Sequence, residues 1–462
     1  MTASTAEQWR DGKRYLWLFG LVMPLLPFAA VALHAATGQG VWLWLGPIVI
    51  LGLVPLVDLV VGIDPSNPPD RVLEALERDR YYRWLTFLFL PLQYAGFAVA
   101  FAYLARADLT VAQRCGLAAT VGFIGGIGIN TAHELGHKKE SHERWLAKTA
   151  LAQSFYGHFY IEHNRGHHVR VATPDDPASS RVGESFYRFW PRTVAGSLRS
   201  AWRLEERRLR RGGGSPWRLG NDVINSWLMS AVLWAAMAVW LGPQVLPYLV
   251  LQAVVAITLL EAVNYLEHYG MLRRRVGAPG HERWERVDPS HSWNSNNVAT
   301  NVLLYHLQRH SDHHANPTRR YQTLRDLPEA PALPTGYAGM ILLALVPPAW
   351  RRVMDPRVAA HLDGDMARAN IHPRHRDRVL ARFPSPATSA ADEPATQAAT
   401  AGAAASAYRC PGCGYTYDVS AGDPREGFPA GTPWSSVPDD WCCPDCGVRE
   451  KVDFVALDSL GA

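Results

Sequence analysis

Cysteine is scarce in this chain: the 462 residues include six, and five of them follow position 409. This distribution excludes a disulfide framework of the kind that holds small secreted folds together. An excess of one charge is also lacking, and a formal net charge of +4 does not indicate a nucleic-acid-binding protein. A hydrophobic fraction of 48% excludes disorder over most of the chain. Histidine, by contrast, is abundant, with 18 copies, many of them in tight clusters.

Long apolar runs lie before residue 270, and six of them reach the roughly 20 residues that cross a bilayer. The short turns between them carry two Lys or Arg in total, whereas the N-terminal segment and the two long loops carry 23. Positively charged loops stay on the cytoplasmic side, so both termini and both long loops are predicted to be cytoplasmic. The predicted membrane helices are residues 15–34, 41–61, 84–105, 115–133, 225–245 and 247–267.

The histidine clusters lie at the end of the fourth span, in the long loop that follows it, and in the segment after the sixth span. HELGH, EHNRGHH and LQRHSDHHA space histidines three or four residues apart, which places the imidazoles on one face of a helix. One more histidine ends the sixth span, in LEHYG, and the resulting set of nine is His133, His137, His163, His167, His168, His268, His310, His313 and His314. A protease zinc takes three protein ligands, and a single octahedral metal takes six. Nine imidazoles are too many for one ion and therefore predict two metal ions. Imidazole without nearby sulfur suits iron, copper or zinc, and the setting indicates redox iron and dioxygen.

Polar residues beside the clusters are candidates for orienting the metal ligands through hydrogen bonds. Adjacent helical residues point about 100° apart, so a carboxylate next to one ligand is expected to reach a histidine of another segment. His306 stands four residues before His310 and would share its helix face. The candidates are Glu134, Glu162, Glu267, Asp312, His158, His291 and His306.

The three histidine boxes HxxxH, HxxxHH and HxxHH resemble those of the integral-membrane di-iron superfamily of desaturases, hydroxylases and alkane monooxygenases. Over roughly residues 13–380 the chain resembles the bacterial alkane 1-monooxygenases, through NTAHELGHKKE, YGHFYIEHNRGHH, VATPDDPASSR, NYLEHYG, HSWNSNN, LQRHSDHHANPTRRYQ and LPTGY. This resemblance implies a mostly α-helical fold, a six-helix membrane bundle with a cytoplasmic site. It also implies two non-haem irons held by the nine histidines, and a place in the bacterial inner membrane.

The tail is predicted to be a separate unit. Residues 384–407 have no aromatic residue and no apolar periodicity, which is typical of a linker between a membrane domain at 1–383 and a small domain at 408–462. Two CxxC knuckles, with Cys410, Cys413, Cys443 and Cys446, predict a tetrahedral sulfur site for iron or zinc.

The motifs CPGCGYTYDVSAGDP, GTPW and PDDWCCPDCG closely resemble rubredoxin, which implies one iron at this site. Cys442 departs from the rubredoxin pattern and is interpreted as a spare thiol. Residues 408–457 carry eight acidic and four basic side chains. Because the whole chain is +4 and this tail is −4, the remainder is +8, and the tail is expected to dock on a basic face.

The fusion of a histidine site to a rubredoxin-like domain favours an oxygenase over a hydrolase. Inserting one atom of dioxygen into a C–H bond, with release of the other as water, consumes two external electrons. The resemblance implies oxidation of linear, medium-chain alkanes to 1-alkanols, with a flavoprotein reductase passing electrons from NAD(P)H to the rubredoxin. The alkane would enter from the membrane lipids, and Ile50 and Glu261 are candidates for its channel.

Three alternatives remain at this stage, and one of them is an electron-transfer or metal-storage membrane protein without catalysis. A membrane desaturase or hydroxylase acting on fatty acyl chains or lipids would share the histidine boxes, and its products would distinguish it. A membrane metalloprotease would use HELGH with a single zinc and Glu134 as general base.

Overall fold

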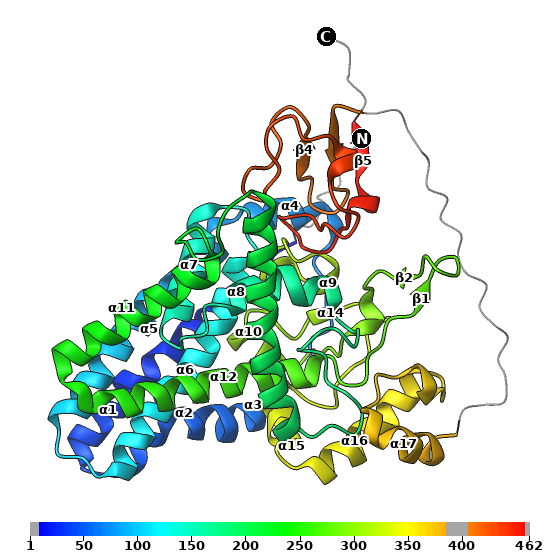
Figure 1. The fold of residues 1–462 in the computed structure, drawn as a ribbon. Coiled ribbons are helices and arrows are strands. Elements are labelled where there is room, and N and C mark those ends of the chain that lie inside the picture. Colours follow the sequence, from blue (N-terminus) through cyan, green and yellow to red (C-terminus); the bar gives the residue numbers. More distant parts are fainter. Residues whose placement is uncertain (1–8, 385–404, 458–462) are drawn as a thin grey trace, which may run out of the picture.

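The computed structural model describes residues 9–384 and 405–457 (Figure 1). The predicted linker at 384–407 therefore lies almost wholly outside the described residues, as do the first eight and last five residues. Among the described residues, six helices are long and apolar enough to cross a membrane, which confirms the predicted number of spans. They cover Leu16–Thr37, Gly40–Val61, Arg80–Arg106, Val111–Gly136, Asp222–Leu241 and Pro243–Glu267.

The first two spans are irregular, and the other four are long α-helices. A 3₁₀ segment, Leu16–Leu25, leads into α1 (Leu26–Thr37). The second span joins a 3₁₀ turn, α2 (Leu45–Pro47), a π-helical segment and α3 (Val54–Val61). The remaining spans are built on α5 (Arg80–Arg106), α6 (Val111–Gly136), α11 (Asp222–Leu241) and α12 (Leu246–Glu267).

The α6 helix is the centre of the bundle, because 89% of its most apolar window is buried. Its GFIGGIGIN stretch allows α12 to approach closely: a Cβ atom at Gly122 would lie 2.6 Å from the backbone oxygen of Gln252, and one at Gly126 would lie 2.7 Å from Leu259. Small residues permit such backbone approach between membrane helices. The α6 helix runs on to Gly136, so its end carries His133 into the centre of the protein.

Shorter helices gather around the ends of α6, α10 and α12 where the histidines lie (Figure 1). They connect the spans and follow the sixth one, and a two-stranded hairpin of β1 (Arg275–Val276) and β2 (Arg283–Trp284) projects beside them. The long helix α10 covers Phe186–Arg211. The shorter helices are α4 (Asp70–Arg78), α7 (Ser141–Ala152), α8 (Phe159–Glu162), α9 (His168–Arg170), α13 (Val298–Leu303), α14 (His310–Ala315), α15 (Tyr337–Ala344), α16 (Pro347–His361) and α17 (Arg376–Arg382).

The tail forms a small domain on the end of α10 (Figure 1). Its sheet is antiparallel, in the order β4 (Thr416–Asp418), β3 (Ala407–Arg409), β5 (Val455–Leu457). Apolar side chains form its core, which comprises Tyr417, Phe428, Val437 and Trp441 with Tyr415, Trp434 and Phe454 packed against them.

Candidate metal centre

The nine clustered histidines converge in two groups, and within each group the candidate ligand atoms lie within 4.8 Å of one another. They come from the end of α6, the π-helical turn His163–His167, α9, the residue after α12, and α14. The five-histidine group is His133, His137, His163, His168 and His313, and the four-histidine group is His167, His268, His310 and His314.

A π-helical turn decides how EHNRGHH is divided between the groups. The backbone N–H of His168 donates to the oxygen of His163, five residues earlier, so these two side chains stack on successive turns. Both therefore enter the five-histidine group, while His167 points into the other one. Simple α-helical spacing pairs His163 with His167 and does not predict this division. Single π-turns inside helices are frequent at functional sites.

The imidazole nitrogens face one another at distances that suit a shared ion. Two ligands at right angles around an ion with metal–nitrogen bonds of about 2.0–2.1 Å stand about 3 Å apart. The Nε2 atoms of His133 and His313 are 2.9 Å apart, and those of His310 and His314 also 2.9 Å. The Nε2 atoms of His137 and His167 are buried and have no hydrogen-bond partner. The donor set therefore fits one metal ion in each group.

Burial prepares these rings for metal binding. It lowers the pKa of His163, His310 and His314 well below the usual range, because the imidazolium form loses hydration inside the protein. Neutral imidazole has the free lone pair that binds a metal. Both groups are thus held in the ligating form at neutral pH.

Residues outside the two groups hydrogen-bond to several of the clustered histidines. Nδ1 of His167 donates to Asp176 at 2.9 Å, and Nδ1 of His268 donates to the backbone oxygen of His291 at 3.3 Å. Glu267 approaches Nε2 of His310 at 3.2 Å and accepts from the hydroxyl of Tyr337. Sequence reasoning missed Asp176, although it lies in the VATPDDPASSR motif, because no helical spacing links it to His167. Such hydrogen bonds fix the tautomer and the orientation of a ligating ring.

The other candidate carboxylates bind basic residues instead. Glu134 pairs with Lys138 at 3.0 Å, Glu162 with Arg170 at 2.8 Å, and Asp312 with Arg319 at 2.9 Å. Among the described residues, no hydrogen bond or ion pair joins them to a clustered histidine. The expectation that these three orient metal ligands is corrected, because each has a cation of its own near in sequence.

His158 and His306 also lie apart from both groups. The ring of His158 packs on Tyr156, with ring centroids 4.4 Å apart. His306 has a positive φ of 53° in a turn, and α14 begins only at His310. It therefore does not share a helix face with His310, and its Nδ1 donates to the backbone oxygen of Tyr321 at 2.9 Å.

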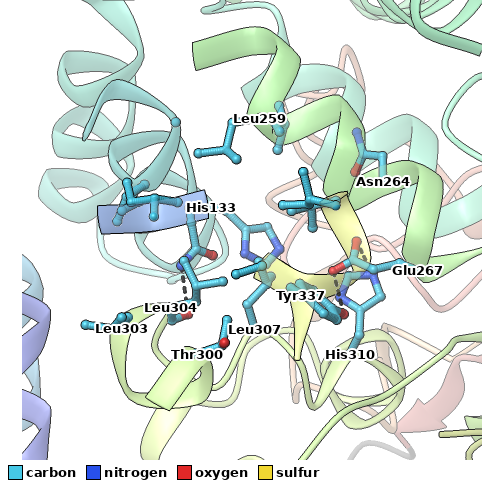
Figure 2. A pocket seen from close by; sticks show the side chains of 18 of the residues that line it. His133, Leu259, Asn264, Glu267, Thr300, Leu303, Leu304, Leu307, His310 and Tyr337 are labelled. Carbon is cyan, nitrogen blue, oxygen red and sulfur yellow. Dashed lines mark hydrogen bonds and ion pairs between the residues drawn. The ribbon is translucent and has the colours of Figure 1, made fainter. Parts of the chain in front are cut away.

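An apolar cavity of about 60 Å³ is lined in part by histidines of both groups (Figure 2). His133, His163 and His310 line it, and so does Glu267. Its apolar lining comes from the first two spans, α6, α12 and the segment before α14, and includes Met23, Ile50, Val54, Ile127, Leu259, Val263 and Leu307. An apolar molecule suits this lining.

The two channel candidates differ in their placement. Ile50 lies in the cavity lining. Glu261 does not: its carboxylate accepts hydrogen bonds from the Tyr156 hydroxyl at 2.7 Å and the Thr193 hydroxyl at 2.9 Å. The placement of Glu261 in the channel is therefore corrected, and the residue joins α12 to the neighbouring segments.

The four knuckle cysteines also converge, with all Sγ atoms within 4.8 Å. The Cys410–Cys446 and Cys413–Cys443 sulfur pairs are 3.8 and 3.5 Å apart. Metal–sulfur bonds of about 2.3 Å in a tetrahedron place sulfurs about 3.8 Å apart, so this set fits one ion. Cys442 lies outside the set, and its thiol contacts the backbone oxygen of Asp440.

The tail domain contacts the membrane domain through opposite charges and through closely packed glycines, of which Gly427 lies against Gly212 of the membrane domain. Arg165 pairs with Glu426 at 3.2 Å, and Arg286 pairs with Asp453. Next to Cys446, Gly447 packs so tightly that a Cβ atom there would lie 2.1 Å from the backbone oxygen of Asn164 and 3.8 Å from Cβ of His168. One sulfur knuckle therefore rests directly on a histidine of the five-histidine group.

Comparison with known proteins gives a consistent result. A fatty acid desaturase family model matches residues 112–344, and a rubredoxin model matches residues 407–454. The chain is 45% identical to alkane 1-monooxygenase 1 of Alcanivorax borkumensis over 377 residues, which are 82% of this chain and 93% of that protein. It is 44% identical to the alkane 1-monooxygenase of Pseudomonas putida over 379 residues, 82% of this chain and 94% of that protein. Within the tail, 49 residues, 11% of this chain, are 80% identical to rubredoxin 3 of Rhodococcus erythropolis and cover 80% of it.

Proposed function

The chain belongs to the alkane 1-monooxygenase family, and we propose that its two histidine groups hold two non-haem iron ions for the terminal hydroxylation of linear alkanes. The observation that carries this proposal is the convergence of nine imidazoles at the end of an apolar cavity. Iron bound there would supply the redox chemistry that reduces dioxygen, and the rubredoxin domain supplies the electrons from its own iron.

The protein's own residues bind and orient the alkane. The cavity lining is apolar and leads to the histidines, so a linear alkane would bind along it with one end toward them. Its terminal carbon then lies near His133, His163 and His310, which accounts for terminal selectivity. Alkanes dissolve in lipid, so the substrate enters from the membrane. We place the enzyme in the bacterial inner membrane with the metal sites on the cytoplasmic side.

Electrons enter the membrane domain where Gly447 touches Asn164 and His168. An NAD(P)H-dependent flavoprotein reductase is the partner that reduces the rubredoxin domain. Two ion pairs hold the domain in this position, Arg165 with Glu426 and Arg286 with Asp453. Complementary charges across an interface favour rapid encounter and fix the docking orientation, which suits repeated electron delivery.

Replacing Gly447 with alanine is expected to slow NADH-driven alkane hydroxylation, because the added methyl group would collide with the Asn164 backbone and move the knuckle away from His168. The measurement is 1-alkanol formation with reductase and NADH, together with the visible spectrum and reduction rate of the rubredoxin domain.

Gly414→Ala is the matched control. Gly414 has a similar positive φ of 76° in the other knuckle, but a Cβ atom there would meet only the Arg409 side chain, at 3.5 Å. Gly447→Ala should lower hydroxylation at least about tenfold more than Gly414→Ala, which corresponds to roughly 1.4 kcal/mol in the barrier. Equal losses in both variants would show that backbone strain, and not docking, is the cause.

Replacing Ile50 with tryptophan is expected to shift the enzyme toward shorter alkanes, because a larger side chain in the cavity lining shortens the space for the chain. Leu53 on the same span is 53% exposed and does not line the cavity, so Leu53→Trp is the control. Product yields from a series of n-alkanes measure the shift. An unchanged chain-length profile in Ile50→Trp would contradict the proposed channel.

Metal analysis tests the proposed iron count. Two histidine groups and one cysteine group predict three irons in each iron-replete chain. An active preparation with one metal in the membrane domain would overturn the dinuclear assignment.

The family model named for fatty acid desaturases supports a second candidate function, oxidation of an acyl chain to an alkene. Alkanol rather than alkene among the products distinguishes the two.

A further inference from the structure

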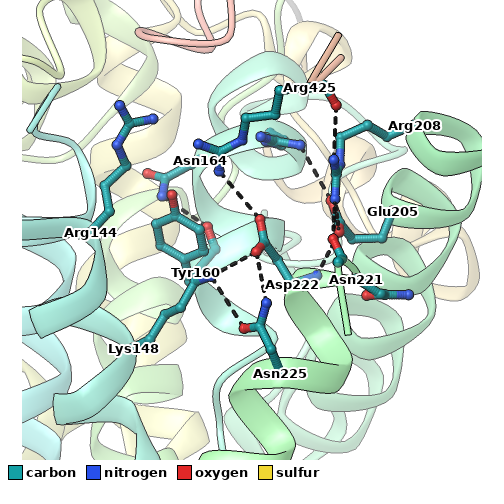
Figure 3. Close-up of polar contacts among 12 residues, drawn as sticks. Arg144, Lys148, Tyr160, Asn164, Glu205, Arg208, Asn221, Asp222, Asn225 and Arg425 are labelled. Carbon is teal, nitrogen blue, oxygen red and sulfur yellow. Dashed lines mark hydrogen bonds and ion pairs between the residues drawn. The ribbon is translucent and has the colours of Figure 1, made fainter. Parts of the chain in front are cut away.

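A second cavity of about 700 Å³ lies where Arg425 of the tail domain meets α7, α10 and α11, and Figure 3 shows the polar contacts at its charged end. Four cationic side chains line it: Arg144 and Lys148 from α7, Arg208 from α10, and Arg425 from the rubredoxin domain. Asp222, the first residue of α11, is the acidic residue in this lining. The cavity therefore combines residues of both domains and an excess of positive charge.

The existing ion pairs leave part of this positive charge free. Lys148 and Arg425 share the Asp222 carboxylate, at 2.7 and 3.4 Å, and Arg208 is paired with Glu205 behind the cavity. In the part of the chain that the structure describes, no salt bridge is formed by Arg144: its guanidinium donates to the backbone oxygen of Lys139, and its Nε is buried without a hydrogen-bond partner. An anion entering the cavity would find Arg144 without an acidic partner and Arg425 only loosely held.

The lining continues from this charged end onto the outer face of a membrane span. Leu228, Met229 and Val232 follow Asn225 along one face of α11 and belong to the same cavity wall. Leu228 is 48% exposed and Val232 61% exposed. The rise of 1.5 Å per residue makes this stripe about 10 Å long from Asn225 to Val232. The exposed Trp145, at the same cavity, is a residue type typical of the membrane–water interface.

We propose that this cavity binds an anionic phospholipid, with its phosphate among Arg144, Lys148, Arg208 and Arg425 and an acyl chain along the Leu228–Val232 face of α11. The charged end explains the preference for an anion, and the apolar stripe on a membrane span explains why the anion is a lipid. Arginine makes charge-assisted, often bidentate hydrogen bonds to phosphate. Because Arg425 belongs to the rubredoxin domain, the lipid would also tie that domain to the bundle.

The test measures lipid retention by the purified full-length protein in detergent, using native mass spectrometry. Dioleoylphosphatidylglycerol and dioleoylphosphatidylcholine are added at equal concentration. We expect preferential retention of phosphatidylglycerol, reduced about tenfold in Arg144→Gln and further in Arg144→Gln/Arg425→Gln, as the loss of charge-assisted hydrogen bonds implies. The rubredoxin-domain spectrum verifies that each variant is folded.

Arg71→Gln provides the matched control, because Arg71 is an exposed residue of α4 that does not line this cavity. It should retain phosphatidylglycerol as the unmodified chain does. Glycerol 3-phosphate, which has the phosphate and no acyl chain, should not displace the lipid at equal concentration. Equal retention of phosphatidylcholine, identical behaviour of Arg144→Gln and Arg71→Gln, or displacement by glycerol 3-phosphate would each overturn the proposal.

Discussion

Replacing His310 with alanine is expected to abolish alkane hydroxylation while leaving the visible spectrum of the rubredoxin domain intact. Nε2 of His310 lies 2.9 Å from that of His314 and 3.2 Å from that of His268, so the four-histidine group would lose the ring that two of its members face. His310 also lines the substrate cavity and contacts Glu267. Loss of a residue that merely supports a ligand costs about 10–100-fold, so loss of a ligand should exceed about 100-fold.

His34→Ala is the control for this substitution. His34 is also buried, on α1, and its ring bonds to the Tyr103 hydroxyl at 2.8 Å, in neither histidine group. Hydroxylation by this variant should stay within a few-fold of the unmodified enzyme. The measurements are 1-alkanol formation and iron content per chain. Full activity and three irons in His310→Ala would remove His310 from the metal site.

Local spacing and composition were sufficient for much of this architecture. Apolar runs predicted six spans because a bilayer imposes a minimum length on any helix that crosses it. The spacing of His133 and His137, and of His310 and His314, predicted converging side chains because both pairs lie one helical turn apart. The paired CxxC knuckles and the family motifs predicted a rubredoxin domain, which the matching family model confirms.

The directions of several histidine side chains depend on tertiary contacts and could not be predicted from the sequence. The pairing of His163 with His168 depends on a π-helical turn, and the bond from His167 to Asp176 depends on how a loop folds back. The prediction that His306 shares a helix face with His310 was wrong, because the chain turns with a positive φ at His306 before α14 begins. In each case the hydrogen bonding of the folded backbone, and not the number of intervening residues, sets where a side chain points.

The docking of the tail illustrates the same limit at the level of domains. The acidic tail and basic remainder predicted attraction, and pairs such as Arg165 with Glu426 form at the interface. A further close contact is uncharged, between Gly447 and the backbone of Asn164, where a Cβ atom would not fit. Charge indicates which surfaces meet, whereas the absence of a side chain at Gly447 allows the cysteine knuckle to lie against His168.

Replacing Cys443 with serine is expected to eliminate both the iron spectrum of the tail and NADH-driven hydroxylation. The Cys443 sulfur is buried and lies 3.5 Å from that of Cys413 in the set of four, so a tetrahedral site would lose one of its four thiolates. The nine histidines are untouched, so iron content should fall from three to two per chain and alkane binding should persist. Hydroxylation should fall to background because no electrons reach the membrane domain.

The adjacent Cys442 provides an unusually close control. It has the same side chain one residue earlier, but its thiol contacts the Asp440 backbone oxygen and lies outside the set of four sulfurs. Cys442→Ser should keep the red iron chromophore, three irons per chain and most of the hydroxylation rate. If Cys442→Ser loses the chromophore while Cys443→Ser keeps it, the knuckle has the other register. If Cys443→Ser loses the chromophore but still forms 1-alkanol from NADH, electrons reach the histidines by a route that bypasses the tail.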